Sequence, residues 1–180
     1  MDDVEVVERY IILLLGVDDG RPIPSATHLQ KELFILGKAN PKVEGIIGFE
    51  KHHFGPYSVD LNDISKNPIH HPDAFVFDSG RKRFYITDKG KELYREMIRE
   101  YGKDPRFEEF LSMMRLVRGL YDGLTTEELL LLICTTYEEY TERSRKSKEL
   151  LSAPKRTMLA RRLLDKGLIT KKRFSELVGG

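Results

Sequence analysis

The chain has 180 residues, of which 40% are hydrophobic and 33% are charged, so it can bury a core without a metal or a disulfide. Its formal net charge is only +1, and its apolar runs at 11–17 and 129–134 are far shorter than the roughly 18 residues of a membrane span. The acidic N-terminus does not match a secretory signal peptide, and a single cysteine, Cys134, excludes an intrachain disulfide framework and a cysteine-based zinc site. We therefore expect a soluble, cytoplasmic protein.

The small net charge conceals a strong separation of charge along the chain. Residues 1–20 carry a net charge of −5 and residues 104–142 carry −6, whereas residues 143–180 carry +9. Such asymmetry indicates either an anionic partner or an acidic surface of the protein itself.

Apolar residues at helical spacing predict two helices at the start of the chain, over 3–15 and 29–36. The second helix begins at a capping box formed by Thr27 and Gln30, or at a competing N-cap, Ser25. Both helices are followed by glycine- and proline-containing turns.

The next segment is expected to contain a strand and a short helix. Pro41 is expected to end the second helix, and residues 46–54 look extended. Ser58 then caps a third helix that ends before Pro68.

Two aromatic and β-branched runs, 74–78 and 83–87, flank a loop that contains a glycine. This pattern predicts a β-hairpin. Thr87 is the expected N-cap of a helix that extends to about residue 101.

Beyond Gly102 the apolar pattern is helical throughout. Helices are predicted over 107–121, 129–140, 143–151, 158–164 and 174–178, and Thr125 and Glu128 predict a capping box at the start of the second of these. We expect two domains, a winged-helix-like domain over 1–102 and a helical extension with a basic C-terminal helix pair over 103–180. The predicted fold class is α+β and mostly α, with a small antiparallel β-hairpin in a winged-helix module followed by the helical extension.

Three stretches carry a resemblance to known winged-helix proteins. The sequence RFYITDKGKEL at 83–93 resembles the second wing strand and the following helix of many prokaryotic winged-helix regulators. The sequence THLQKELFIL at 27–36, followed by FGPYS at 54–58, resembles the Panacea-type (SocA-like) antitoxin domain and related archaeal winged-helix proteins of unknown function. Residues 126–140 are similar to the C-terminal helices of that group. The resemblance implies a DNA-binding regulator, or an antitoxin-like protein with a protein partner, and it implies no catalysis.

Arg81, Lys82 and Arg83 occupy the loop of the predicted hairpin. In a wing, these cations would contact phosphates or an A·T-rich minor groove, whereas the alternative is a turn that only aids solubility. The third predicted helix carries Asp60 and Asp63, and carboxylates are unfavourable beside phosphate. Either that helix does not read the groove, or this face binds something other than DNA.

A second basic cluster lies in the last two predicted helices. It consists of Lys155, Arg156, Arg161, Arg162, Lys171, Lys172 and Arg173. The two helices join through a tight turn at 167–170 and look like a helix-turn-helix, so their cations are candidates for phosphate contacts. The alternative is that the tail packs onto the acidic segment 104–142, within the chain or across a dimer.

The sequence contains no convergent set of catalytic groups. The pairs His52-His53 and His70-His71 lack the spacing of a metal site, and no glycine-rich phosphate loop occurs. We therefore expect no enzymatic activity, no metal and no cofactor. Apolar residues over 113–121 and 129–133 exceed what one face needs, so they either form part of a dimer interface or pack in a core of the tail itself. Winged-helix regulators commonly dimerise, so the resemblance implies a homodimer. The leading hypothesis is a transcriptional regulator that binds DNA, and the alternative is an antitoxin-like or scaffold module that binds another protein without DNA.

Overall fold

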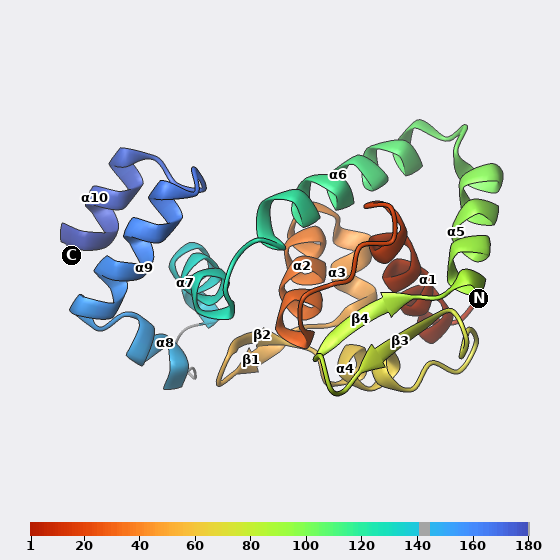
Figure 1. Ribbon diagram of the computed structural model, residues 1–180, viewed down its shortest axis with the longest axis horizontal. Coiled ribbons are helices and arrows are strands. Elements are labelled where there is room, and N and C mark those ends of the chain that lie inside the picture. Colours follow the sequence, from red (N-terminus) through yellow and green to blue (C-terminus); the bar gives the residue numbers. More distant parts are fainter. Residues whose placement is uncertain (141–144, 180) are drawn as a thin grey trace. The chain divides into compact units, whose positions relative to one another are not determined.

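The computed structural model describes residues 1–140 and 145–179 as helices and two small antiparallel hairpins (Figure 1). This arrangement confirms the expected fold class, α+β and mostly α. The helices are α1 (Asp3–Gly16), α2 (Ala26–Ala39), α3 (Pro41–Ile47), α4 (Val59–Lys66), α5 (Asp88–Tyr101), α6 (Pro105–Tyr121), α7 (Thr126–Thr136), α8 (Arg145–Leu150), α9 (Ala153–Asp165) and α10 (Lys171–Gly179), with a 3-10 turn η1 (Glu138–Tyr140). The strands are β1 (Glu50–His52), β2 (Gly55–Tyr57), β3 (Phe75–Asp78) and β4 (Arg83–Ile86).

The chain divides into two compact units, whose boundaries differ from the expected one after residue 102. The first unit comprises Met1–Phe49 and Ser58–Asp122, and the second comprises Glu50–Tyr57 and Gly123–Gly180. Helix α6 belongs to the first unit because it packs against α1 and α2. The hairpin β1–β2 belongs to the second unit, where β2 contacts α7 and β1 contacts η1.

Helix α1 forms the centre of the first unit. Its sequence is apolar on nearly every face, a pattern typical of a helix surrounded by protein, and Ile11, Ile12, Leu14 and Leu15 are fully buried. Helices α3, α4, α5 and α6 and strand β4 all contact it. Since burial of one such side chain is worth about 1.5–3 kcal/mol, α1 supplies a large part of the core energy.

The segment after α2 differs from the extended segment that the sequence predicts. Asn40 caps α3 by accepting a hydrogen bond from the Lys42 amide at 3.1 Å. Pro41 lies in the first turn of α3, where its fixed φ suits a helix and its missing N–H is not needed. The extended prediction for residues 46–54 is therefore wrong in its first part, because the proline that follows one helix also begins another.

A buried glutamine fixes the start of α4 against α2. Ser25, and not Thr27, caps α2 by accepting a hydrogen bond from the His28 amide at 3.1 Å. The buried Gln30 side chain donates to the Ser58 carbonyl at 2.8 Å and accepts from the Ser58 amide at 2.9 Å. Ser58 is itself the N-cap of α4, as expected. These paired hydrogen bonds orient α4 in the first unit.

The hairpin β3–β4 forms at the expected position, with Phe75 paired to Ile86. Ile23, in the connection between α1 and α2, pairs with Phe84 through two backbone hydrogen bonds of 3.0 and 3.1 Å. Strand β4 therefore lies between β3 and this extended residue. The connection between the first two helices thus holds the hairpin against the helical core.

Helix α5 starts directly after β4, and a glycine permits the close approach. Thr87 caps α5 by accepting a hydrogen bond from the Gly90 amide at 3.1 Å, and it donates to the Ala74 carbonyl at 3.1 Å. A Cβ atom at Gly90 would lie 2.0 Å from that carbonyl oxygen. The threonine and glycine of the segment 83–93 are therefore both required by this strand-to-helix junction.

The second unit has its own helical core. Helix α7 packs against α8 and α9, and α9 packs against α10. Leu159 and Leu163 of α9 are fully buried. Thr125 and Glu128 form the expected capping box of α7, and Gly167, with φ of +72°, lies in the turn between α9 and α10.

Candidate nucleic-acid interface

The turn between β3 and β4 is built around the Asp78 side chain. Its carboxylate accepts hydrogen bonds from the Gly80 amide at 2.9 Å and the Arg81 amide at 3.0 Å. The hydrogen bond from the Arg81 amide is the main reason that the pKa of Asp78 lies below its ordinary value. Lys82 has a φ of +59°, in the left-handed region that favours glycine. The turn thus keeps a lysine at its tip despite a conformational cost of about 1 kcal/mol.

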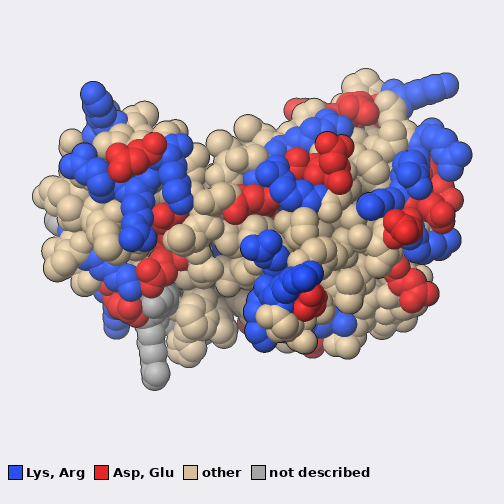
Figure 2. Space-filling view, viewed as in Figure 1, with Lys and Arg blue, Asp and Glu red and all other residues tan. Residues whose placement is uncertain are grey.

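The three cations of this turn point their charge to solvent. Arg81, Lys82 and Arg83 are all exposed, and in the described part of the chain none of them forms an ion pair. Basic side chains gather over this end of the hairpin in Figure 2. Arg81 also interacts electrostatically with the Asp78 carboxylate, but no ion pair holds any of the three cations in the described residues. The structure therefore brings the three residues together with their charges available to phosphate groups.

The exposed face of α4 is acidic. Asp60 and Asp63 are exposed, and Val59 is 59% exposed. The only cation of this helix, Lys66, lies over the Phe77 ring with its Nζ 5.7 Å from the ring centroid. Because carboxylates repel phosphate, α4 offers no phosphate-binding surface.

A buried carboxylate anchors the loop that joins α4 to β3. Glu8 of α1 is fully buried and accepts hydrogen bonds from the amides of Ile69 at 2.6 Å, His70 at 3.1 Å and His71 at 2.7 Å. Three donors on one carboxylate fix this loop to α1. The loop in turn sets where β3 begins relative to α4.

Part of the basic tail is paired within the second unit. The Lys155 Nζ donates hydrogen bonds to the Glu127 carboxylate at 2.7 Å and to the Glu149 carboxylate at 2.9 Å, and these hydrogen bonds raise the pKa of Lys155. The Lys166 Nζ lies 2.6 Å from the buried Glu128. Since Glu127 and Glu128 belong to the segment 104–142, these contacts correspond to the alternative in which the tail packs onto that acidic segment.

Two arginines of the predicted tail cluster also contact their own unit. Arg156 donates to the Leu151 carbonyl at 3.2 Å. Arg173 donates to the Thr135 carbonyl at 2.9 Å and pairs with Glu176 at 3.2 Å. These guanidinium groups connect neighbouring helices, so they are less available to an external anion.

The other four members of the tail cluster are exposed: Arg161, Arg162, Lys171 and Lys172. The Arg161 guanidinium lies 4.4 Å from the centroid of the Phe174 ring, a cation–π contact that leaves its charge in place. No ion pair involves these four residues in the part of the chain that the structure describes. The predicted tail cluster is therefore split into a paired group and an exposed group.

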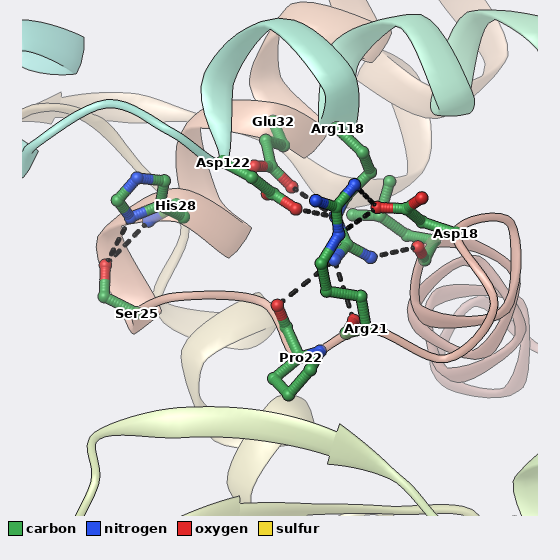
Figure 3. A network of polar contacts seen from close by, with 9 residues as sticks. Asp18, Arg21, Pro22, Ser25, His28, Glu32, Arg118 and Asp122 are labelled. Carbon is green, nitrogen blue, oxygen red and sulfur yellow. Dashed lines mark hydrogen bonds and ion pairs between the residues drawn. The ribbon is translucent and has the colours of Figure 1, made fainter.

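A buried polar network joins α1, α2 and α6 (Figure 3). The fully buried Arg118 donates to the Asp122 carboxylate at 2.8 Å and to the carbonyls of Leu14 and Arg21, each at 2.7 Å. The Glu32 carboxyl lies 4.0 Å from the same guanidinium. Sequence patterns do not indicate this network, because its members are far apart in the chain and a buried arginine cannot be distinguished from a surface arginine by its position in the sequence.

The network also helps to position the hairpin β3–β4. The Arg21 carbonyl that Arg118 binds lies two residues before Ile23, which pairs with β4. Arg118 therefore fixes the segment that holds the inner edge of the hairpin. It is a positioning residue of the candidate interface, and it does not touch the solvent.

Glu32 makes the stability of the fold depend on pH. Burial raises the pKa of Glu32 well above its ordinary value, and the Asp122 carboxylate raises it further, whereas Arg118 lowers it. The folded protein therefore binds more protons than the unfolded chain above the ordinary carboxyl pKa. Its free energy of unfolding falls as the pH rises, by up to about 1.4 kcal/mol per pH unit, until the raised pKa is passed.

We expect Glu32→Gln to remove this loss of stability, because an amide has no charge to desolvate. Urea unfolding of the variant and the wild type should give similar stabilities near pH 4 and a more stable variant near pH 8. The exposed Glu109 of α6 supplies the control Glu109→Gln, which should follow the wild type. A variant that is less stable than the wild type near pH 8 would show that Glu32 acts as a carboxylate in the folded protein.

The described residues hold no cluster typical of a metal centre. No group of three histidine, cysteine, aspartate or glutamate side chains among them can hold a metal ion, and Cys134 is a buried free thiol. None of the helices described is long and apolar enough to cross a membrane. No protein-family model matches this sequence.

Proposed function

We propose that the protein is a non-enzymatic DNA-binding protein of the winged-helix type, with β3–β4 as its wing and a role in transcriptional regulation. The observation that carries this proposal is the turn with Arg81, Lys82 and Arg83, which presents three exposed cations without ion-pair partners in the described residues. Helices α1, α2 and α4 precede the hairpin β3–β4, with α3, β1 and β2 inserted between α2 and α4, and Ile23 pairs with β4. The helices that lead into the hairpin and the pairing of Ile23 support the assignment of the hairpin as a wing.

The acidic face of α4 restricts the proposal. Asp60 and Asp63 would face phosphate if this helix entered the major groove, so the wing supplies the phosphate contacts of the first unit. In the second unit, the exposed cations of the tail are the candidates for further contacts. These are Arg161, Arg162, Lys171 and Lys172.

A titration with mixed-sequence duplex DNA, followed by fluorescence anisotropy at several salt concentrations, tests the wing. We expect the triple variant Arg81→Gln/Lys82→Gln/Arg83→Gln to bind about tenfold or more weakly at low salt. Loss of three phosphate contacts should also reduce the slope of log K against log salt by about 3. Glutamine at position 82 should not disturb the turn, because the left-handed φ costs lysine and glutamine a similar conformational free energy.

A charge-matched variant removes three other exposed lysines, Lys42, Lys89 and Lys103, by substitution with glutamine. It should bind DNA more tightly than the wing variant and retain most of the salt slope. Equal weakening by the two triple variants would show that only net charge matters. Absence of binding by the wild type at low salt up to tens of micromolar would remove the proposal.

A second function, recognition of a protein partner, is favoured by the chemistry around α4. Asp60 and Asp63 surround a groove whose floor is apolar and includes Val7 and Leu61. The variant Asp60→Asn/Asp63→Asn, added to the DNA titration, separates the two functions. It should strengthen DNA binding if DNA passes along α4, because it removes repulsion, and it should leave DNA binding unchanged if this face serves a protein.

The homodimer remains part of the proposal, with a smaller candidate interface than the sequence suggests. Met114 and Val117 of α6 are buried within the first unit. Leu116 and Leu120, one turn apart, are 61% and 38% exposed. These two leucines form the candidate contact of α6 with a second copy of the chain.

A further inference from the structure

A groove of about 490 Å³ runs between α5 and α6 in the first unit. Its lining residues are Tyr94, Arg95, Ile98 and Arg99 of α5 and Glu108 and Arg115 of α6. None of them belongs to the wing or to the basic tail. Figure 2 shows basic side chains gathered over the region of α5, with acidic side chains beside them.

The floor of the groove is apolar and well supported. The Tyr94 ring rests on Gly16 at the end of α1, where a Cβ atom would lie 2.3 Å from the ring. Tyr94 and Ile98 are only partly buried, so each leaves apolar surface exposed in the groove. An occupant with apolar side chains would gain by covering this surface.

The walls of the groove carry three arginines that are available to an anion. Arg95, Arg99 and Arg115 are exposed, and none of them forms an ion pair in the described part of the chain. By contrast, Arg9 pairs with Glu5 on the same helix at 3.0 Å, and Arg106 pairs with Asp104, the N-cap of α6, at 2.9 Å. The groove contains one carboxylate, Glu108, against three arginines, none of which pairs with it in the described residues. Unpaired guanidinium groups that converge from two helices are typical of sites that bind carboxylate or phosphate.

We propose that this groove binds an acidic peptide segment of a partner protein, with its carboxylates on Arg95, Arg99 and Arg115 and its apolar side chains over Tyr94 and Ile98. The three arginines favour an occupant with negative charge, and the apolar surface of Tyr94 and Ile98 favours one that also has apolar side chains. A small ion would remain hydrated, because the arginines are exposed.

Two features favour a peptide over a nucleic acid at this place. Glu108 lies on the wall of the groove, where it would repel phosphates and carboxylates alike. A nucleic acid carries a phosphate at every nucleotide, whereas a peptide can place a neutral residue beside Glu108 and donate a backbone amide to it. The Tyr94 ring has one side covered by Gly16 and stands beside an aliphatic residue, so the floor is not a platform of successive aromatic rings. This proposal does not depend on DNA binding by the wing.

Selection from a displayed library of random twelve-residue peptides tests the groove directly, with the full-length protein as bait. Peptides are counter-selected on the variant Arg95→Gln/Arg99→Gln/Arg115→Gln, in which glutamine keeps much of the side-chain stem. We expect the enriched peptides to carry net negative charge and aromatic or leucine residues. Binding of labelled copies of these peptides should weaken about tenfold or more in the variant, since charge-assisted hydrogen bonds are lost.

The variant Lys42→Gln/Lys89→Gln/Lys103→Gln has the same change in net charge outside the groove and should bind the peptides within about twofold of the wild type. Unfolding midpoints of both variants confirm that their folds are intact. The proposal is overturned if the enriched peptides show no acidic bias, or if both triple variants weaken binding equally. It is also overturned if a single-stranded oligonucleotide binds the wild type, loses binding in the arginine variant and displaces the peptides.

Discussion

We expect Arg118→Ala to lower the free energy of unfolding by about 3–5 kcal/mol, the largest effect of any single substitution discussed for this protein. The fully buried guanidinium binds the Asp122 carboxylate and the carbonyls of Leu14 and Arg21. Alanine leaves all of these acceptors without their donor in an interior that excludes water. A buried acceptor without a partner costs about 1–3 kcal/mol, and a buried carboxylate costs more.

Urea unfolding at neutral pH measures this effect. Two further variants show whether the loss comes from the hydrogen bonds of the Arg118 guanidinium. Arg118→Lys keeps the charge but lacks the planar fork that reaches several acceptors, so it should recover only part of the loss. Arg106→Ala removes an exposed arginine of the same helix that pairs with its N-cap, Asp104, and should barely move the unfolding midpoint. If Arg118→Ala unfolds at nearly the urea concentration of the wild type, the network does not stabilise the fold.

The loss should extend to the wing, because Arg118 fixes the segment that precedes Ile23. At temperatures where Arg118→Ala is still folded, amide exchange of β4 should be faster than in the wild type, while exchange in α9 of the second unit should change little. This comparison separates a local effect on the hairpin from general destabilisation of the chain.

Removal of the Glu8 side chain should have the second largest effect on the free energy of unfolding. We expect Glu8→Ala to lower the free energy of unfolding by about 3 kcal/mol, since three backbone amides lose one buried carboxylate acceptor. The matched control is Glu5→Ala, one turn earlier on α1, where the carboxylate forms a partly exposed pair with Arg9 at 3.0 Å. Surface pairs of this kind are worth about 0.5 kcal/mol or less.

Amide exchange locates the effect of Glu8→Ala. The amides of Ile69, His70 and His71 should exchange much faster in this variant and keep their wild-type rates in Glu5→Ala. Because the loop that they form sets the start of β3, DNA binding through the wing should also weaken in Glu8→Ala. Unchanged exchange at these three amides would show that water or another acceptor replaces the carboxylate.

Local sequence patterns predict the structure correctly where the determining interactions lie within a few residues of each other. The capping box of Thr125 and Glu128 and the N-cap at Thr87 both form as expected. The hairpin over 75–86 also forms at its predicted place. In each case a side chain contacts its own turn or its neighbouring strand, so the sequence spacing alone specifies the contact.

Sequence patterns mislead, or leave a choice open, where one residue type supports two outcomes. Pro41 ends one helix and also begins α3, and Ser25 and Thr27 both qualify as N-caps of α2. The choice of Ser25 leaves Gln30 to bind Ser58, which lies 28 residues away. A contact over that distance has no local signature, so the sequence could not decide between the two caps.

The division into two units and the state of the charges were also beyond local patterns. Helix α6 joins the first unit because its apolar face packs on α1 and α2. Lys155 is paired with Glu127 and Glu149, whereas Lys171 is exposed, although both residues belong to the same basic stretch. Charge counts give the sum over a segment, and only the folded chain shows which charges neutralise each other.

The sequence by itself determined the mostly helical α+β character, the hairpin with three cations at its turn and the absence of a cysteine framework, because these follow from composition and from spacing over a few residues. Tertiary structure alone decided that Arg118 and Glu8 are buried and bound, and that the arginines of α5 and α6 share a groove. The physical reason is that burial and charge pairing depend on residues that are distant in the chain, and their energies change with whether water is excluded from around them.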